Sequence, residues 1–422
     1  MPMSISVESE NYDVIVLGAG YAGLMAALRL GRRRLGLRVA LVNSEETFVE
    51  RVRLQESMVA PVKPRIASLS AYLARKPIDF IRAHVVALDV ERRRVRVEAD
   101  GSLRDLGFDQ IICALGSRVD VQNAPGVEEH CFRLDAGTGP RSAAALRTKL
   151  LANAERRFRV LAIGGGPLSV EAAAEVKTAW PQMDVSLVSA SRAGAFTSAK
   201  VEASLRRDLS KLGVTLIDHE RIGEVRETEV VSVNGRRLPY DICIWAAGMR
   251  ASPIAKEAGL DVDAQDRIRV GPDLRSLSHP FVLAVGDCGH PIAPTGAPYR
   301  ASALTAAVSG VYAAEQAIAN RVGRPLPPFS FSTFAQAIAI GRYAAVFPLD
   351  ANDHPILFVI GGRIARRLRA VLIWLVLHFV TFERSFPGVQ SWPGRKRVSK
   401  RQATVAVENP RVVHPKKNQR SG

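Results

Sequence analysis

Short apolar runs alternate along the chain with longer segments that have the periodicity of helices. Runs rich in Val, Ile and Leu lie at 13–17 and 38–42, and again at 159–163 and 184–188. A helical pattern separates the two members of each pair. Short continuous apolar runs are typical of strands that are buried on both faces, and their alternation with helices predicts an α/β fold with parallel sheets.

A glycine-rich turn, GAGYAG, follows the first strand of the first pair. Between a strand and a helix, Gly18 permits a tight turn, Gly20 lets the backbone approach a pyrophosphate, and Gly23 lets the helix pack closely on the strand. The pyrophosphate then meets the helix N-terminus, where free N–H groups and the helix dipole favour an anion. The turn therefore predicts a dinucleotide site, which also includes Ala19, Tyr21 and Ala22.

The same unit occurs a second time, with the turn GGGPLS at 164–169. Ser169 replaces the third glycine, and this small residue still permits close packing. Each unit is followed by a distal apolar strand that ends in Ala-x-Gly, at 108–117 and at 240–249. This internal repeat predicts two dinucleotide sites in one chain. A flavin and a nicotinamide are the natural pair, because hydride can pass between them.

A third apolar strand, in FVLAVGDCGH at 281–290, ends in Gly286-Asp287. A carboxylate at the end of a strand can bind a chain of sugar-like hydroxyls, while the glycine lets a cofactor approach. The alternative is an ordinary turn in which an Asp ends a strand. After two dinucleotide motifs, the cofactor interpretation is favoured.

GAGYAG, ICALGS, GGGPLSVE, IWAAG and VLAVGDC, in this order, resemble the two-dinucleotide flavoprotein superfamily of pyridine nucleotide-disulfide oxidoreductases over residues 10–390. The four cysteines form no CxxC or CxxxxC pair, so the resemblance is to the branch without a redox disulfide. The segment AAEVKTAWPQMDVSLVSA is similar to type II NADH dehydrogenases and ferroptosis suppressor protein. The resemblance implies two Rossmann-like domains, non-covalent FAD, and NADH or NADPH as cosubstrate.

The resemblance also implies roles for individual residues. For FAD it implies that the loop at 18–23 binds the pyrophosphate and that the backbone of Val85 contacts the adenine. It also implies that the chain passes FAD at Gly116, and that the carboxylate of Asp287, next to Gly286, binds the ribityl chain. Arg51 and Arg53 lie in a loop that, by the same resemblance, passes FAD, and a nearby arginine contacts the cofactor. For the nicotinamide coenzyme it implies Gly164, Gly166, Ser169 and the distal Gly248. Glu171 matches an acidic residue near the nicotinamide, which we expect to position that ring.

Two positions depart from the family pattern. Asn43 stands where an acid usually binds the ribose hydroxyls of FAD, and an amide makes this bond without charge assistance. The second unit has Ser189 at the corresponding position, so no acid repels a 2′-phosphate there. Ser191 and Arg192 could hold that phosphate, which leans the choice toward NADPH and leaves NADH open.

The motifs predict an FAD-binding domain in two parts, 1–140 and 266–330, with a NAD(P)H-binding domain inserted at 141–265. Hairpins are expected at 95–101 and 229–238, and a strand at 356–360. A small C-terminal region at 331–394 contains an apolar helix, 370–382. The tail at 395–422 is basic and without periodicity, and we expect it to be disordered.

Charge and hydropathy limit the partners. The net charge is +17, and residues 363–422 carry twelve of these charges, which favours an anionic surface over nucleic acid as the partner of this end. No apolar run reaches 18 residues, so we expect no transmembrane helix. The helix at 370–382 either lies in a membrane interface, with Arg363, Arg366, Arg367 and Arg369 toward lipid phosphates, or is buried against the FAD domain or in a homodimer interface.

The leading hypothesis is an FAD-dependent NAD(P)H oxidoreductase that takes hydride from NAD(P)H and passes electrons to a quinone-type acceptor. One alternative is a soluble flavoprotein reductase of another acceptor, such as a ferredoxin-like protein or a small molecule. Another is a non-catalytic flavin-binding protein. We expect no metal site, and a cytoplasmic protein or one that is peripheral on the inner face of a membrane.

Overall fold

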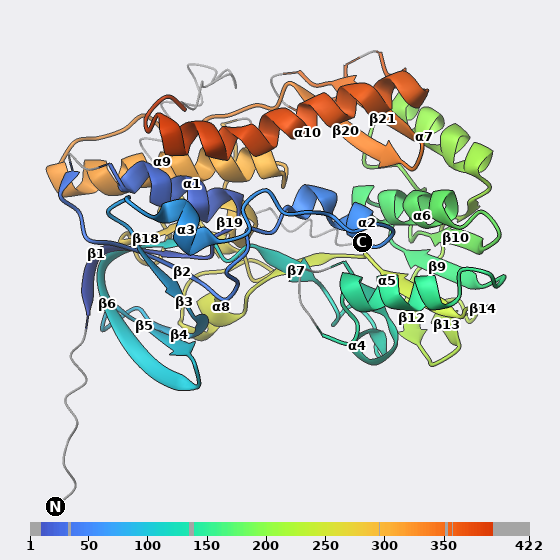
Figure 1. The fold of residues 1–422 in the computed structure, drawn as a ribbon, viewed down its shortest axis with the longest axis horizontal. Helices are drawn as coiled ribbons and strands as arrows, with labels where there is room; N and C mark the ends of the chain where they lie inside the picture. The colour runs from blue at the N-terminus through green and yellow to red at the C-terminus, as the bar shows by residue number, and fades with distance from the viewer. Residues whose placement is uncertain are drawn as a thin grey trace, which may run out of the picture.

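The computed structural model describes residues 10–32, 35–134, 139–294, 296–350, 353–356 and 358–390. The tail at 395–422, which is expected to be disordered, lies outside these residues. Two large sheets form the body of the molecule, and near the C-terminus a small sheet lies on the second domain and is followed by a long helix that extends over both (Figure 1).

The first sheet has the strand order β3-β2-β1-β6-β5-β4, with β18 paired to β6. Its parallel strands are β1 (Asn11–Leu17), β2 (Val39–Asn43), β3 (Asp79–Arg82), β18 (Val282–Ala284) and the end of β6 (Ser102–Cys113). An antiparallel extension is formed by β4 (His84–Asp89), β5 (Arg94–Ala99) and the start of β6. The hairpin that the sequence predicts at 95–101 is confirmed as the β5–β6 turn.

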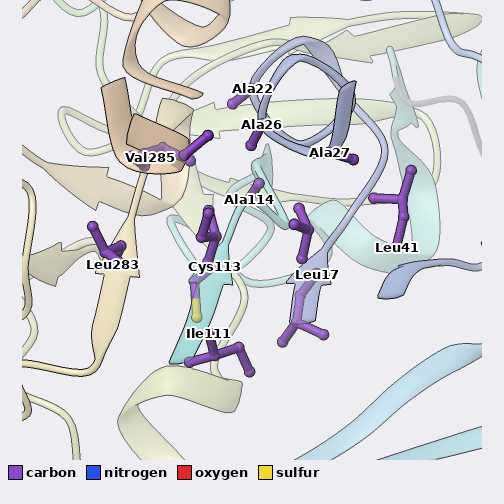
Figure 2. Packing of buried hydrophobic residues seen from close by; sticks show 14 of the residues in the cluster. Leu17, Ala22, Ala26, Ala27, Leu41, Ile111, Cys113, Ala114, Leu283 and Val285 are labelled. Atoms are coloured by element: carbon purple, nitrogen blue, oxygen red, sulfur yellow. The ribbon is translucent and has the colours of Figure 1, made fainter. Parts of the chain in front are cut away.

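Two helices with small residues cover one face of this sheet. Helix α1 (Tyr21–Leu30) packs on α9 (Ala303–Val322), and Gly310 leaves no room for a Cβ atom against the backbone of Ala22. Figure 2 shows Leu17, Cys113 and Leu283 from three neighbouring strands beneath Ala22 and Ala26 of α1. Such close packing explains why these strands are apolar on both faces and why the helices are rich in Ala.

The second sheet is wholly parallel, with the order β11-β10-β9-β15-β8. Its strands are β8 (Phe132–Arg133), β9 (Arg159–Ile163), β10 (Asp184–Val188), β11 (Thr215–Ile217) and β15 (Ile242–Trp245), and its helices are α5 (Ala143–Ala152), α6 (Pro167–Ala179) and α7 (Ala199–Leu212). Strand β8 precedes residue 141, so this sheet includes residues that the sequence assigns to the first domain. Strand β8 belongs to the second sheet because it pairs with β15. The sequence does not predict this, because a strand of two residues has no periodic pattern.

A small antiparallel sheet extends the second domain. It consists of β12 (Ile222–Val225), β13 (Glu229–Ser232) and β14 (Arg237–Pro239). The predicted hairpin at 229–238 is confirmed as β13–β14, and Gly235 has a φ of +80° in its Asn-Gly turn. Short elements complete the two domains: α2 (Leu54–Ser57), α3 (Leu69–Leu73), α4 (Val127–His130), α8 (Ile254–Glu257), β17 (Ile268–Arg269) and β19 (Gly289–His290).

An antiparallel ribbon joins the two domains. It pairs β7 (Ser117–Val119) with β16 (Met249–Ala251), and β7 lies between the two sheets in Figure 1. The strands follow directly on Gly116 and Gly248, so the two predicted distal glycines both lead into this connection. Arg250 fixes the ribbon by ion pairs to Asp120 at 3.1 Å and Asp266 at 3.0 Å.

The C-terminal unit consists of β20 (Ala335–Ile340), β21 (Tyr343–Pro348), β22 (Ile360–Gly361) and α10 (Gly362–Ser385). Helix α10 runs across the top of both domains in Figure 1. It is longer than the predicted helix at 370–382, because its arginine-rich first turns are also helical. The predicted strand at 356–360 is wrong for the described residues Ile356, Phe358 and Val359, which belong to no strand, and right for Ile360; residue 357 lies outside the described residues.

Candidate cofactor and active site

The first glycine loop has the geometry that a pyrophosphate needs. Gly18 has a φ of +93°, and a Cβ atom there would collide with the Ala114 carbonyl. Gly23 packs equally closely on the Gly18 carbonyl, which brings α1 onto the strand. Around Gly20, by contrast, no described atom lies within 4 Å of a Cβ position, and no described side chain caps the N-terminus of α1. The backbone at Gly20 is therefore open to a ligand, at a helix N-terminus whose first N–H groups have no side-chain cap among the described residues.

Asn43 braces the loop. Its Oδ1 accepts a hydrogen bond from the Ala19 N–H at 2.8 Å, and its Nδ2 donates to the Glu45 carbonyl at 2.8 Å. The side chain therefore joins the end of β2 to the glycine loop. An amide can do both at once because it carries a donor and an acceptor, whereas a carboxylate could only accept.

The structure brings five of the predicted FAD residues together. Ser117 donates from Oγ to Asp287 Oδ2 at 2.9 Å, and Arg51 Nη1 donates to the Ser117 carbonyl at 2.6 Å, next to Gly116. Gly286 has a φ of +63° and lies against Ala22 of α1. These contacts link Asp287, which follows β18, to Gly116 and Ser117, which follow β6.

Arg53 and Val85 are not among the contacts of Asp287. Arg53 forms ion pairs with Glu50 at 3.2 Å and Glu56 at 2.9 Å. Val85 is a buried residue of β4 in the core of the first domain. Of the two arginines that the sequence offers for FAD, Arg51 is therefore the one beside the carboxylate.

A cavity of about 250 Å³ opens beside Asp287. The N-terminus of α9 lines it, with Ser302 as N-cap accepting a hydrogen bond from the Thr305 N–H at 3.0 Å. A helix N-terminus places partial positive charge at this wall, which suits an electron-rich ring. Residues that the sequence did not single out also line the cavity, and they include Arg267, His290, Arg300 and Ser117.

His290 is held by a carboxylate in this wall. Its Nδ1 lies 2.8 Å from Asp263 Oδ2, and burial is the main cause that lowers the pKa of His290. The neutral ring therefore uses Nδ1 as donor to Asp263. His290 ends the segment 281–290, but nothing in the sequence pairs it with Asp263, because the two meet only through the pairing of β17 with β19.

The second glycine loop repeats the geometry of the first. Gly164 has a φ of +136° and leaves no room for a Cβ against the Ala246 carbonyl, while around Gly166 no described atom comes within 4 Å of a Cβ position. Ser169 is buried, and its Oγ donates to the Gly166 carbonyl at 2.9 Å. The hydroxyl is thus satisfied locally, which explains how serine replaces the third glycine.

The segment that follows β10, beside this loop, is polar. Ser189 Oγ accepts a hydrogen bond from the Ser191 N–H at 3.3 Å, and Ser189 is buried. Arg192 is half exposed, with its Nε 2.7 Å from Glu202 Oε1. Gly248 has a φ of +82° and packs against Asn123 and Asp120.

Glu171 lies on the second turn of α6, at the interface with the C-terminal unit. Its Oε1 accepts a hydrogen bond from the Ala339 N–H of β20 at 2.8 Å and lies 3.5 Å from Arg369 Nη2 of α10. Burial raises the pKa of Glu171 to about 7, and Arg369 opposes this shift. The carboxyl group can therefore gain or lose a proton near neutral pH.

Comparison with known proteins decides the family. The family model of pyridine nucleotide-disulphide oxidoreductases matches residues 12–311. The chain belongs to this family. It is 25% identical to demethylphylloquinone reductase NdbB of Synechocystis, over 79% of this chain and 85% of the relative. It is 21% identical to the type II NADH:quinone oxidoreductase of Haemophilus influenzae, over 79% of this chain and 86% of the relative.

Solved structures of the same fold agree. NDH2 of Plasmodium falciparum, solved in complex with NADH, has a TM-score of 0.72 at 14% identity, and the match covers 91% of this chain and 99% of that one. Reduced CoADR-RHD of Bacillus anthracis has a TM-score of 0.69 at 18% identity, and the match covers 86% of this chain but only 63% of that longer protein. The prediction of two Rossmann-type units in a disulfide reductase-like fold is confirmed.

The family match ends before the C-terminal unit. The partners of Glu171 at 339 and 369 therefore lie outside the matched region, as do the apolar positions of α10. In the sequence, Arg369 is one of four arginines that face lipid phosphates if the helix lies in a membrane interface, and no pattern there predicts its contact with Glu171. Nothing in the spacing of the arginines distinguishes the one that turns inward, because that depends on how α10 is seated on β21.

Proposed function

We propose that this chain is an FAD-dependent NAD(P)H oxidoreductase that passes electrons to a quinone-type acceptor. The observation that carries the proposal is the pair of glycine loops, in which the backbone is open to a ligand at Gly20 and at Gly166. A ribbon joins their domains, and Asp287 stands at the cavity beside the first loop. Relatives named as quinone reductases support the acceptor class.

The residues present suit both dinucleotides. FAD supplies the chemistry of accepting hydride and releasing electrons when it is bound. The α1 N-terminus at Gly20 would hold its pyrophosphate, Asp287 a ribityl hydroxyl, and the α9 N-terminus the pyrimidine side of the ring. The loop at 164–169 would hold the coenzyme. The protein acts mainly by orientation, and Glu171 would position the nicotinamide and hold or move a proton at its carboxyl group.

The absorbance spectrum of the purified protein tests this function. We expect flavin bands that NADH or NADPH bleaches without oxygen and that a soluble quinone restores. Flavin bands that neither coenzyme bleaches would contradict the function and favour a flavin-binding protein without catalysis. Bleaching that only a ferredoxin-like protein or another small molecule reverses would contradict the quinone assignment alone.

Coenzyme choice gives a further prediction. No acid occupies position 189, and Arg192 lies beside Ser191, so NADPH should serve at least as well as NADH. Arg192→Ala should raise KM for NADPH more than KM for NADH, because only NADPH offers a 2′-phosphate to a guanidinium. Steady-state kinetics with both coenzymes measure this. Equal losses would show that Arg192 does not contact the 2′-phosphate, which fits its pairing with Glu202.

Peripheral membrane contact through α10 is part of the proposal. Among the described residues, no helix combines the length and hydropathy needed to cross a bilayer. Helix α10 has two apolar faces. Leu377 and Val380 are buried in the protein, whereas an outer stripe is exposed, formed by Ile364, Val371, Trp374, Leu375 and Phe382, and exposed Phe386 follows the end of the helix. Arg363 and Arg367 border this stripe, whereas Arg366 lies on the other side of the helix, toward Glu175 of α6. We therefore propose that one face of α10 is buried against the protein and that the exposed face meets the membrane interface, so that both alternatives from the sequence hold for the same helix.

Sedimentation with anionic liposomes tests this contact. Full-length protein should bind, and high salt should weaken binding without abolishing it, because each exposed apolar side chain that inserts adds about 1 kcal/mol or more. Val371→Glu with Leu375→Glu changes only the outer stripe and should release the protein. If salt alone removes wild-type protein completely, or the variant binds as well, the stripe does not meet lipid.

A further inference from the structure

The partners of Glu171 come from a part of the chain that the family model does not match. The carboxylate lies on α6, in the matched region, but Ala339 belongs to β20 and Arg369 to α10. The β20–β21 hairpin is seated closely on α6, since Gly341 leaves no room for a Cβ against Thr178 and the Ala174 carbonyl. The C-terminal unit is thus built directly onto the helix that carries Glu171.

Arg369 bridges two carboxylates. Its Nη2 lies 3.5 Å from Glu171, and its Nη1 lies 3.3 Å from Glu56 Oε1 of α2. The side chain is 11% exposed, so water screens these pairs little. A planar guanidinium suits this position because its N–H groups point at two acceptors at once. Glu56 is held in turn by Arg53 at 2.9 Å, so the arrangement extends from α2 through α10 to α6.

We infer that Arg369 is a positioning residue of this oxidoreductase, which holds the Glu171 carboxylate in place from α10, so that α10 is part of the active site. This rests on the proposed function, in which Glu171 meets the nicotinamide. A helix that presents an apolar stripe to its surroundings therefore also sets the charge state of a group at the coenzyme site.

The charges around Glu171 determine the direction in which its pKa changes when Arg369 is lost. Burial is the main cause that raises the pKa of Glu171, and Glu175 of α6 and Glu56 of α2 also raise it; the net pKa is about 7. Arg369 and the Ala339 N–H lower it, and Arg366 of α10 acts on the neighbouring Glu175. Loss of Arg369 removes the main charge that favours the carboxylate. The pKa of Glu171 then rises, and less of it is ionised at neutral pH.

The experiment compares pH profiles of the full-length enzyme. Flavin reduction by the preferred coenzyme and turnover with a soluble quinone are measured in wild type, Arg369→Met and Arg369→Lys. We expect Arg369→Met to move the midpoint of the kcat profile to higher pH by about one unit or more, with a smaller change in KM. Arg369→Lys should restore most of the wild-type profile. Arg342→Met removes an exposed positive charge from the same unit, at the β20–β21 turn, and serves as the control.

A second variant separates charge from a folding defect. Glu56→Gln removes a carboxylate that raises the pKa of Glu171, so its profile should move to lower pH, opposite to Arg369→Met. Identical profiles in wild type and Arg369→Met, or shifts of the same sign in Arg369→Met and Glu56→Gln, overturn the inference and leave the proposed function intact. A wild-type flavin that neither coenzyme reduces overturns the proposed function, and the inference falls with it.

Discussion

Asp287→Ala should purify with much less FAD than wild type. The substitution removes a charge-assisted hydrogen bond to the ribityl chain, which contributes about 1.5–3 kcal/mol, or roughly a tenfold to hundredfold change in affinity. It also leaves the Ser117 hydroxyl, which donates to Asp287 at 2.9 Å, without its acceptor at the wall of the cavity. The ratio of flavin to protein absorbance after gel filtration measures the loss.

The matched control is Asp105→Ala. Asp105 pairs with Arg96 at 2.8 Å on the exposed β5–β6 hairpin of the same domain, and surface pairs of this kind contribute little. Flavin content should therefore stay at the wild-type level. A folded Asp287→Ala protein with full flavin occupancy would falsify the assignment of Asp287.

Glu383→Ala should destabilise the seating of α10 by about 3 kcal/mol. Glu383 is 0% exposed and accepts from Nε and Nη2 of Arg29, which is itself 2% exposed on α1. It also accepts from the Gly388 N–H at 2.9 Å. Removing the carboxylate leaves a buried guanidinium whose described acidic partner is Glu315 at 2.8 Å, and breaking such a pair costs about 3–5 kcal/mol. Faster proteolysis within α10 and a lower melting temperature report the effect.

The double variant Arg29→Met, Glu383→Met provides the test of cause. It removes both charges and leaves no buried ion, so it should regain most of the lost stability. Glu224→Ala, which breaks an exposed pair with Arg226, is the control and should melt like wild type. If the double variant melts no higher than Glu383→Ala, packing at position 383 and not the unpaired charge explains the loss.

The two glycine loops could be predicted from sequence because their physics is local. A tight turn at Gly18, open backbone at Gly20 and close packing at Gly23 each follow from the lack of a Cβ atom at fixed steps after a strand. The same holds for the Asn-Gly hairpin at 235. Ser169 was tolerable for a local reason as well, since its hydroxyl bonds to the carbonyl three residues earlier.

The sequence by itself determined the fold class, the two dinucleotide loops and the position of Asp287 after its strand. Only the tertiary structure decided which distant side chains meet them. Arg369 and Ala339 reach Glu171 through the seating of α10 and β20, and Asp263 reaches His290 through a pair of two-residue strands. Such contacts leave no periodic signal, because they depend on how whole elements pack. For the same reason, the apolar run in α10 could not show that it has one buried and one exposed face.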